Sequence, residues 1–165
     1  MSVEKVRAYL EPYGVADRIR EFDVSSATVE LAALAVGVEG ARIAKTLSFK
    51  IGEEPILVVA AGDAKVDNSK YKHFFGVKAK MLTADEAVAR IGHAVGGVCP
   101  FALPEDVKTY LDVSLKRFDT VFPAVGSAAS AIELTCDELE RCCGKNFTQW
   151  VDVCKGWQPE EASAP

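Results

Sequence analysis

Apolar residues at helical spacing predict two helices in the first part of the chain. Residues 3–10 carry the first pattern, and the Pro-Tyr-Gly sequence at 12–14 ends it because proline and glycine do not continue a helix. A run rich in alanine and leucine ends at Gly37 and predicts the second helix. Ser25 and Ser26 precede this run, and we expect one of their hydroxyl groups to cap the helix.

Two later helices are predicted by threonines that precede acidic residues. Thr83 is followed by an acidic first turn, which favours a cap and a helix to about residue 91. Thr135 precedes the same kind of turn, and we expect its helix to run to Cys143 and stop at Gly144.

Strands are predicted where apolar and polar residues alternate, or where a short apolar run stands alone. Residues 43–51 alternate, residues 52–55 form a turn, and residues 56–61 give the buried partner strand of the hairpin. Further strands are expected at residues 20–24, 107–112, 120–124, 131–134 and 147–153. Because helices and strands are interspersed and several strands are adjacent in sequence, the pattern favours a mixed α+β domain over a doubly wound one.

The composition is that of a soluble globular chain. Of its 165 residues 49% are apolar and 26% are charged, close to the average of folded domains. The longest stretches without Asp, Glu, Lys or Arg, residues 91–104 and 120–132, are shorter than the ~18 residues that a membrane helix requires. The first twenty residues mix charges throughout, so we expect no signal peptide, no membrane contact and a cytoplasmic location.

One segment departs from the acidic character of the chain. The net charge is −5, which argues against a protein that coats nucleic acid through a global positive field. Residues 65–80 nevertheless contain five lysines and one acid, a local charge of +4. The five are Lys65, Lys70, Lys72, Lys78 and Lys80. They either contact a nucleic-acid backbone or form a solvated face.

The cysteines predict neither a disulfide framework nor a metal site. There are five, two of them adjacent and none in Cys-x-x-Cys spacing, which fits reduced thiols in a cytosolic chain. A zinc site requires paired ligands, commonly with histidines, and His73 and His93 lie far from the C-terminal cysteines. We therefore expect no metal and no cofactor, and we expect the cysteines to pack as small apolar residues in or near the core.

Two features are unusual enough to indicate a binding site. The Gly-Gly-Val-Cys-Pro-Phe sequence at 96–101 can approach a ligand closely and present successive N–H groups to an oxygen atom. An ordinary connecting loop is an equal alternative. Lys45 lies within an apolar strand, where it either faces solvent or anchors a phosphate or carboxylate as a fixed charge. The chain has no phosphate-binding glycine motif and no Gly-x-Ser-x-Gly motif.

Four motifs follow one another along the chain. They are the Lys45 strand at 43–49, the Gly-x-x-x-Pro loop from Gly96 to Pro100, the strand ending in Asp112, and the glycine loop at 122–127 before residues 131–134. In order and separation they resemble the YbaK/prolyl-tRNA synthetase-associated domain family, as do residues 26–30. The resemblance spans residues 2–154 and predicts one editing domain, followed by a flexible tail at 158–165.

The resemblance implies an α+β fold built round a mixed, barrel-like sheet, and aminoacyl-tRNA editing as the activity. Members of the family hydrolyse the ester that joins a wrong amino acid to the terminal adenosine of tRNA, typically tRNA for proline. The 2′-hydroxyl of the substrate assists the attack, so no side-chain nucleophile is required. The expected partners are the acceptor end of aminoacyl-tRNA and, for a docked editor, prolyl-tRNA synthetase.

Carried over by position, the resemblance also implies roles for individual residues. The catalytic set is Lys45, Gly96, Gly97 and Asp112. Lys45 would hold the 3′-terminal nucleotide, and the backbone of residues 96–98 would cradle the ester carbonyl and the ribose hydroxyls. Asp112 orients a water molecule or is a structural carboxylate. The substrate-binding set is Ser26, Thr28, Val98, Pro100, Gly126 and Ser127, and the tRNA-contacting set is Lys65, Lys70 and Lys72.

One departure from the family bears on the substrate. The domain inserted in bacterial prolyl-tRNA synthetases carries a histidine in its last glycine loop, where this chain has Gly-Ser-Ala-Ala at 126–129. This favours a YbaK-like editor that acts in trans and leaves alanine, cysteine, serine and non-protein amino acids open as substrates. Cys99 is a nucleophile only if a base activates it, and packing beneath the loop is the alternative. A non-catalytic sensor of charged tRNA and a redox thiol protein are the competing functions.

Overall fold

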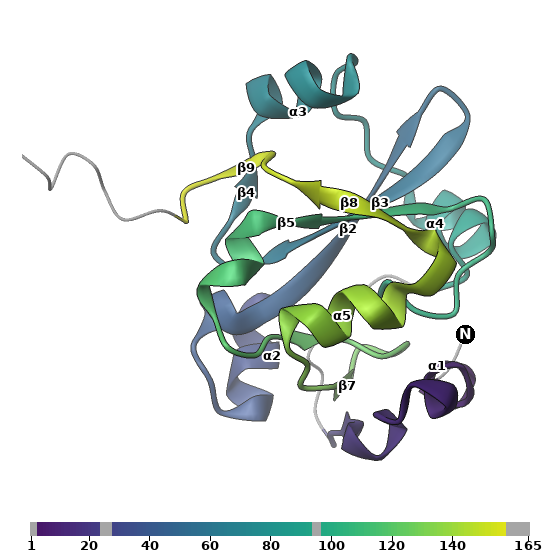
Figure 1. The fold of residues 1–165 in the computed structure, drawn as a ribbon, viewed down its shortest axis with the longest axis vertical. Coiled ribbons are helices and arrows are strands. Elements are labelled where there is room, and N and C mark those ends of the chain that lie inside the picture. The colour runs from purple at the N-terminus through teal and green to yellow at the C-terminus, as the bar shows by residue number, and fades with distance from the viewer. Residues whose placement is uncertain (1–2, 24–27, 94–96, 158–165) are drawn as a thin grey trace, which may run out of the picture.

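A curled five-stranded sheet forms the centre of the fold (Figure 1). The computed structural model describes residues 3–23, 28–93 and 97–157. In spatial order the strands are β6 (Phe122–Pro123), β2 (Ile43–Ile51), β3 (Glu54–Ala61), β5 (Lys108–Asp112) and β8 (Phe147–Val151). β2 and β3 form the predicted antiparallel hairpin, whereas the other neighbours pair in parallel. The mixed α+β class is therefore confirmed.

Two pairs of short antiparallel strands connect distant parts of the chain. β1 (Arg20–Glu21) pairs with β7 (Ser130–Ala131), and β4 (Lys65–Val66) pairs with β9 (Cys154–Lys155). The second pair places the end of the described chain beside the segment that follows β3.

The described residues form five α-helices, and side-chain caps fix where four of them begin. The helices are α1 (Val3–Leu10), α2 (Val29–Val36), α3 (Asn68–Phe75), α4 (Ala84–Arg90) and α5 (Cys136–Cys143). The caps predicted at Thr83 and Thr135 are confirmed, since both form reciprocal capping boxes. No described helix is long and apolar enough to cross a membrane.

The predicted cap of α2 was wrong. Ser25 and Ser26 lie outside the described residues, and the cap is Thr28, whose Oγ1 accepts a hydrogen bond from the Leu31 amide at 3.1 Å. The helix begins at Val29, so the N-cap position belongs to Thr28 and not to a serine.

Different helices cover the two faces of the sheet (Figure 1). α3 covers one face, where the ring of Tyr71 packs 5.1 Å from that of Phe49 on β2, and Phe75 packs 5.0 Å from Tyr110 on β5. α1 and α5 lie on the opposite face, and the fully buried Leu139 of α5 belongs to the same core.

Several elements differ from the prediction, among them the strands expected at 20–24 and 147–153, which are Arg20–Glu21 and Phe147–Val151. The strands expected at 120–124 and 131–134 shrink to Phe122–Pro123 and Ser130–Ala131, because Pro123 has no N–H to extend a ladder. The lysine-rich segment contains α3, which the sequence did not predict because its charges obscured the buried Tyr71. The predicted tail at 158–165 lies outside the described residues.

Candidate functional site

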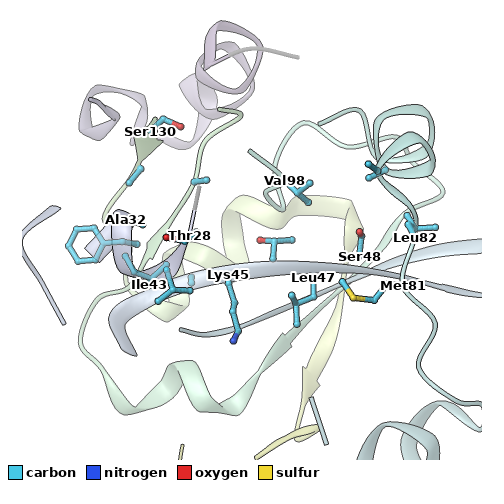
Figure 2. Close-up of a pocket in the computed structure, with 18 of the residues that line it drawn as sticks. Thr28, Ala32, Ile43, Lys45, Leu47, Ser48, Met81, Leu82, Val98 and Ser130 are labelled. Carbon is cyan, nitrogen blue, oxygen red and sulfur yellow. The ribbon is translucent and has the colours of Figure 1, made fainter. Parts of the chain in front are cut away.

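A cavity of about 350 Å³ opens along the outer edge of β2 (Figure 2). Residues 43–48 of β2 line its base, Thr28 and the start of α2 line one side, and residues 81–84 with Ala87 line the other. Val98 and parts of the segment 122–131 complete the boundary. The described lining is apolar apart from hydroxyl groups and Lys45, and it contains no acidic or histidine side chain.

The cavity lies at a gap in the hydrogen bonding of β2. At one end β6 pairs only with Ile43 and Ala44. At the other end the Lys50 amide donates to the Lys80 carbonyl at 2.9 Å, and the Leu82 amide donates to the Ser48 carbonyl at 3.1 Å. No described strand pairs with the outer edge of residues 45–47 between these contacts. A ligand in the cavity therefore meets an unpaired strand edge.

An ion pair fixes the wall formed by α4. The Lys50 ammonium lies 2.6 Å from Oε2 of Glu86, and the same carboxylate completes the capping box with the Thr83 amide. The hydrogen bond from Lys50, followed by that from the Thr83 backbone, lowers the pKa of Glu86 to about 2. The carboxylate therefore stays charged at neutral pH and holds the N-terminus of α4 against β2.

Two loops meet behind Val98. A Cβ atom placed on Gly97 would lie 2.9 Å from both Cα and N of Ser127, which is closer than real Cβ contacts. Gly126 adopts a φ of 99°, the left-handed region that favours glycine. The predicted loop residues Gly97, Gly126 and Ser127 are thus adjacent, and their contact fixes Val98 at the cavity. Gly96 lies outside the described residues.

Cys99 is buried beneath this loop. Its thiol is fully shielded from solvent, and burial raises its pKa to about 12. Nε2 of His93 lies 2.8 Å from the Phe101 carbonyl and 3.5 Å from the Cys99 sulfur. His93 is itself buried, and burial lowers its pKa below the ordinary value. The geometry fits the packing alternative for Cys99, because a neutral imidazole that donates to a carbonyl does not activate a thiol.

Lys45 extends away from the other lining groups. Figure 2 shows its side chain on the side of β2 opposite to Ser48 and Val98. The ammonium donates to the carbonyl of Ala64 and, at 3.4 Å, to that of Gly62. Burial lowers the pKa of Lys45 from its usual value. Lys45 is therefore a lining residue whose charge is held by the turn that follows β3.

Asp112 is fully buried at the end of β5 and does not line the cavity. Its carboxylate accepts hydrogen bonds from the amides of Ser114 and Val153, each at 2.9 Å. These contacts join β5 to the segment that leads into β9. They are those expected of a structural carboxylate, one of the two roles that the sequence left open. The water-orienting role stays a prediction.

The five lysines of residues 65–80 do not share one environment. The Lys70 ammonium lies 3.0 Å from Asp152 and 3.1 Å from the Cys154 carbonyl, so it connects α3 to the segment from β8 to β9. The other four are exposed and form no ion pair within the described residues; they are Lys65, Lys72, Lys78 and Lys80. Lys80 immediately precedes Met81, a lining residue that is 55% exposed. Of these exposed lysines, Lys80 is therefore the one next in sequence to a residue of the cavity.

The sequence predicted some of the residues that line the cavity. Thr28, Val98 and Lys45 line it, whereas Pro100 is buried and Ser26 lies outside the described residues. Sequence reasoning missed Thr46 and Ser48. The signal that could have found them is their alternation in 43–51, which places both side chains on one face of β2.

The chain resembles known proteins over most of its length. Residues 24–142 match the model of the aminoacyl-tRNA editing domain. The chain is 52% identical over 160 residues to the uncharacterized protein YwhH of Bacillus subtilis (strain 168), covering 96% of this chain and 100% of that protein. It is 28% identical over 125 residues to EbsC of Enterococcus faecalis, named as a proposed Cys-tRNA(Pro)/Cys-tRNA(Cys) deacylase, covering 74% of this chain and 76% of that protein.

A solved structure shows the same fold. It is described as that of a proposed trans-editing enzyme for prolyl tRNA synthetase, and it superimposes with a TM-score of 0.83 at 28% sequence identity. The alignment covers 94% of this chain and 99% of that structure. Because the family model also matches well over half of the sequence, the chain belongs to the aminoacyl-tRNA editing domain family.

Proposed function

We propose that this protein is a trans-acting aminoacyl-tRNA deacylase that hydrolyses the ester of mischarged tRNA. The substrate class is tRNA for proline carrying alanine, cysteine or another small amino acid. The observation that carries the proposal is the cavity at the unpaired edge of β2, bounded by the Val98 loop, in a chain of the editing family. The named functions of EbsC and of the structural neighbour support the same reaction.

The reaction needs little from protein side chains. An aminoacyl ester is already activated, so positioning and stabilisation of the developing oxyanion supply much of the rate gain. Water adds to the ester carbonyl carbon, the bond between that carbon and the ribose oxygen breaks, and the ribose oxygen takes up a proton released by the water. The products are the free amino acid and tRNA with a free ribose hydroxyl. In this proposal the N–H groups of residues 97–98 face the carbonyl oxygen, and the substrate's 2′-hydroxyl assists the water.

The architecture of the loop supports a backbone role for residues 97–98. Gly97 is fixed by its contact with Ser127, so the N–H groups beside it need no reorganisation during the reaction. A thiol nucleophile is disfavoured, because Cys99 is buried with a pKa of about 12. No histidine or carboxylate in the described lining is available to activate a serine.

Lys45 is proposed to act on the 3′-terminal nucleotide. Direct contact requires the ammonium to leave the carbonyls of Gly62 and Ala64. While it stays there, Lys45 is a positioning residue that holds the end of β3 beneath the cavity. Salt dependence separates the two roles, because a phosphate contact contributes to counterion release and a backbone contact does not.

The exposed lysines are proposed to contact the acceptor stem of the tRNA. Lys72 and Lys78 lie on and just after α3, and Lys80 precedes the cavity wall. Phosphate contacts by such side chains position a nucleic acid without reading its sequence. In this proposal Lys70 has a structural role and does not contact the tRNA, because its charge is paired with Asp152.

The test is deacylation of tRNA for proline charged with alanine, cysteine, serine or proline. We expect loss of at least one misacylated ester while prolyl-tRNA is spared, and a lower rate with Lys45→Ala. If charged tRNA binds but none of the four esters is hydrolysed faster than in buffer, the protein is a sensor instead. Full activity after all thiols are blocked in unfolded protein and the chain is refolded would exclude the redox alternative.

A further inference from the structure

A buried histidine lies beside the loop of residues 97–101 and takes no part in the proposed reaction. His93 is fully shielded from solvent and does not line the cavity. Its Nε2 atom lies 2.8 Å from the Phe101 carbonyl oxygen, whereas its Nδ1 atom has no hydrogen-bond partner in the described residues. Most buried polar atoms are paired, so an imidazole that is buried for one hydrogen bond requires an explanation.

The Phe101 carbonyl determines which ring nitrogen carries the proton. A carbonyl oxygen only accepts hydrogen bonds, so Nε2 of His93 is the protonated atom and Nδ1 is not. The same oxygen accepts a longer hydrogen bond from the Cys99 thiol, at 3.9 Å. Phe101 is fully buried, and none of the described backbone N–H groups donates to its carbonyl. The imidazole is therefore the main donor to a carbonyl that water does not reach.

The hydrogen bond joins the end of helix α4 to the end of the loop. The Gly92 amide donates to the Ala87 carbonyl at 3.1 Å, so His93 directly follows the last turn of the helix. Phe101 lies at the other end of the loop, and its ring is 6.5 Å from that of Tyr9 on α1. Because Ala87 also lines the cavity, the bond fixes the loop relative to one wall of the cavity.

The backbone next to this hydrogen bond is strained. Ala102 adopts a φ of 57°, and among the described residues it is the only one other than glycine with a positive φ. Such a conformation persists where the surrounding contacts determine it, and it is common beside functional sites. The Phe101 carbonyl belongs to the peptide unit that joins Phe101 to Ala102. Its hydrogen bond to His93 therefore fixes the orientation of the peptide that leads into the strained residue.

We infer that His93 is a positioning residue of the proposed deacylase, which holds the loop through the Phe101 carbonyl so that the N–H groups of residues 97–98 face the ester. The inference rests on the proposed function, which assigns these N–H groups to the developing oxyanion. The contact between Gly97 and Ser127 fixes one end of the loop of residues 97–101, and the His93 hydrogen bond fixes the other. Donors held at both ends need no reorganisation as charge develops on the ester oxygen.

Two variants separate the hydrogen bond from the volume of the side chain. Leucine and glutamine are both close to histidine in size, but only the glutamine amide has an N–H group at the position of Nε2. We expect kcat for a misacylated tRNA to fall about thirtyfold or more in His93→Leu and to return to within about fivefold of the native value in His93→Gln. KM should stay within about threefold in both variants, because His93 does not line the cavity. His73→Leu, at the exposed histidine of α3, is the matched control and should leave kcat unchanged.

Two further measurements separate positioning from folding. Thermal unfolding checks that each variant is folded. His93→Asn takes the place of His93→Leu if the leucine variant does not fold, because its shorter amide corresponds to Nδ1 and does not reach the carbonyl. Residual dipolar couplings of the Gly97 and Val98 amides report the orientation of their N–H groups without any reaction. We expect these couplings to change in His93→Leu and to return to the native values in His93→Gln.

The outcomes distinguish this inference from the proposed function. Cleavage by the native protein with equal kcat in His93→Leu and His93→Gln would overturn the inference and leave the deacylase intact. If the native protein cleaves no ester, the proposed function fails and the couplings decide on the histidine. Couplings that change with leucine and recover with glutamine would still support His93 as the residue that positions the loop, and unchanged couplings would overturn it.

Discussion

Gly97 rests directly on the backbone of Ser127, so closely that no β-carbon fits between them. The two residues belong to loops separated in sequence, and their contact defines the boundary of the cavity beside Val98. The neighbouring atoms are Cα and N of Ser127, which cannot rotate away as the end of a flexible side chain would. The loop geometry proposed to hold the ester therefore depends on a single missing methyl group.

Gly97→Ala tests this dependence. The added methyl would lie 2.9 Å from the Ser127 backbone and must push the two loops apart. We expect deacylation to fall about a hundredfold, because a displacement near 1 Å can cost that much in an oriented site. Gly52→Ala, in the β2–β3 turn where nothing lies within 4 Å, is the control. It should cost stability through its φ of 61° and leave the rate nearly unchanged. Equal rates in both variants would contradict the proposed role of the loop.

Lys45→Met distinguishes the two roles of the lysine. Methionine retains most of the buried stem but leaves the carbonyls of Gly62 and Ala64 without their donor. We expect a loss of about 1–3 kcal/mol in the free energy of unfolding, the cost of an unpaired buried polar group. We also expect a fall in kcat with an unchanged salt slope of tRNA binding. A slope reduced by close to one unit would assign Lys45 to a phosphate instead.

Cys99 should prove dispensable for chemistry and resistant to thiol reagents. Its thiol is fully buried, and its pKa is about 12, so almost no thiolate exists at neutral pH. We expect Cys99→Ser to retain deacylation within a few-fold. In the folded protein Cys136, the partly exposed cysteine, should react first with a thiol reagent, and the four buried ones only after unfolding. Mass spectrometry of the labelled peptides checks the order. Rapid labelling of Cys99 with loss of activity would reinstate it as a nucleophile.

The basic surface after α3 predicts a salt-sensitive contact with tRNA. Lys72 and Lys78 are exposed and form no ion pair within the described residues. The double variant Lys72→Glu with Lys78→Glu should weaken tRNA binding about tenfold or more in low salt, and the difference should shrink as salt is added. Lys145→Glu, after α5, reverses one charge at a site distant in sequence and is the control for Lys72→Glu alone, which makes the same change of charge. Filter binding across a salt series checks both, and identical curves would assign the lysines to a solvated face.

The sequence predicted the β2–β3 hairpin well because its signals are local. Residues 43–51 alternate, residues 56–61 are continuously apolar, and the structure pairs them from Ala44 with Ala61 to Ile51 with Glu54. Alternation defines two faces of a strand, but it does not say which face borders a cavity. Lys45 was therefore correctly placed on the strand, while the direction of its ammonium depended on the turn after β3.

The rest of the site depended on contacts between distant segments. Thr46 and Ser48 are small polar residues in an alternating strand, a pattern that usually indicates a solvent-facing side. They border a cavity here because β6 stops at Pro123 and the Lys50–Glu86 pair fixes the N-terminus of α4 at the far end of the strand. Neither contact can be read from a local window of sequence.

The protein should lose folding stability in acid in part because Glu138 becomes protonated. Its carboxylate accepts hydrogen bonds from Nη1 and Nη2 of Arg18 at 2.8 and 2.9 Å, and from the Thr135 amide at 2.9 Å. The Arg18 hydrogen bond, followed by that from the Thr135 backbone, lowers the pKa of Glu138 from 4.5 to about 2. Because the folded-state pKa is depressed, the charged form contributes stability that is fully present above pH 4.5 and is lost as the pH falls toward about 2.

Glu138→Gln should remove this contribution to stability. The difference in the free energy of unfolding between the native protein and the variant should therefore depend on pH. We expect the variant to be less stable than the native protein by about 1–2 kcal/mol at pH 7, from the lost ion pair and the weakened cap. The difference should narrow as the pH is lowered through the window from 4.5 to about 2, because the native carboxyl then becomes neutral as well. Urea unfolding at pH 7, 5 and 3 measures it. Asp137→Asn changes the charge of the neighbouring residue in the same helical turn and should show no such narrowing. A constant difference for Glu138→Gln at all three pH values would mean that the cap geometry, and not the charge, joins α5 to the N-terminal segment.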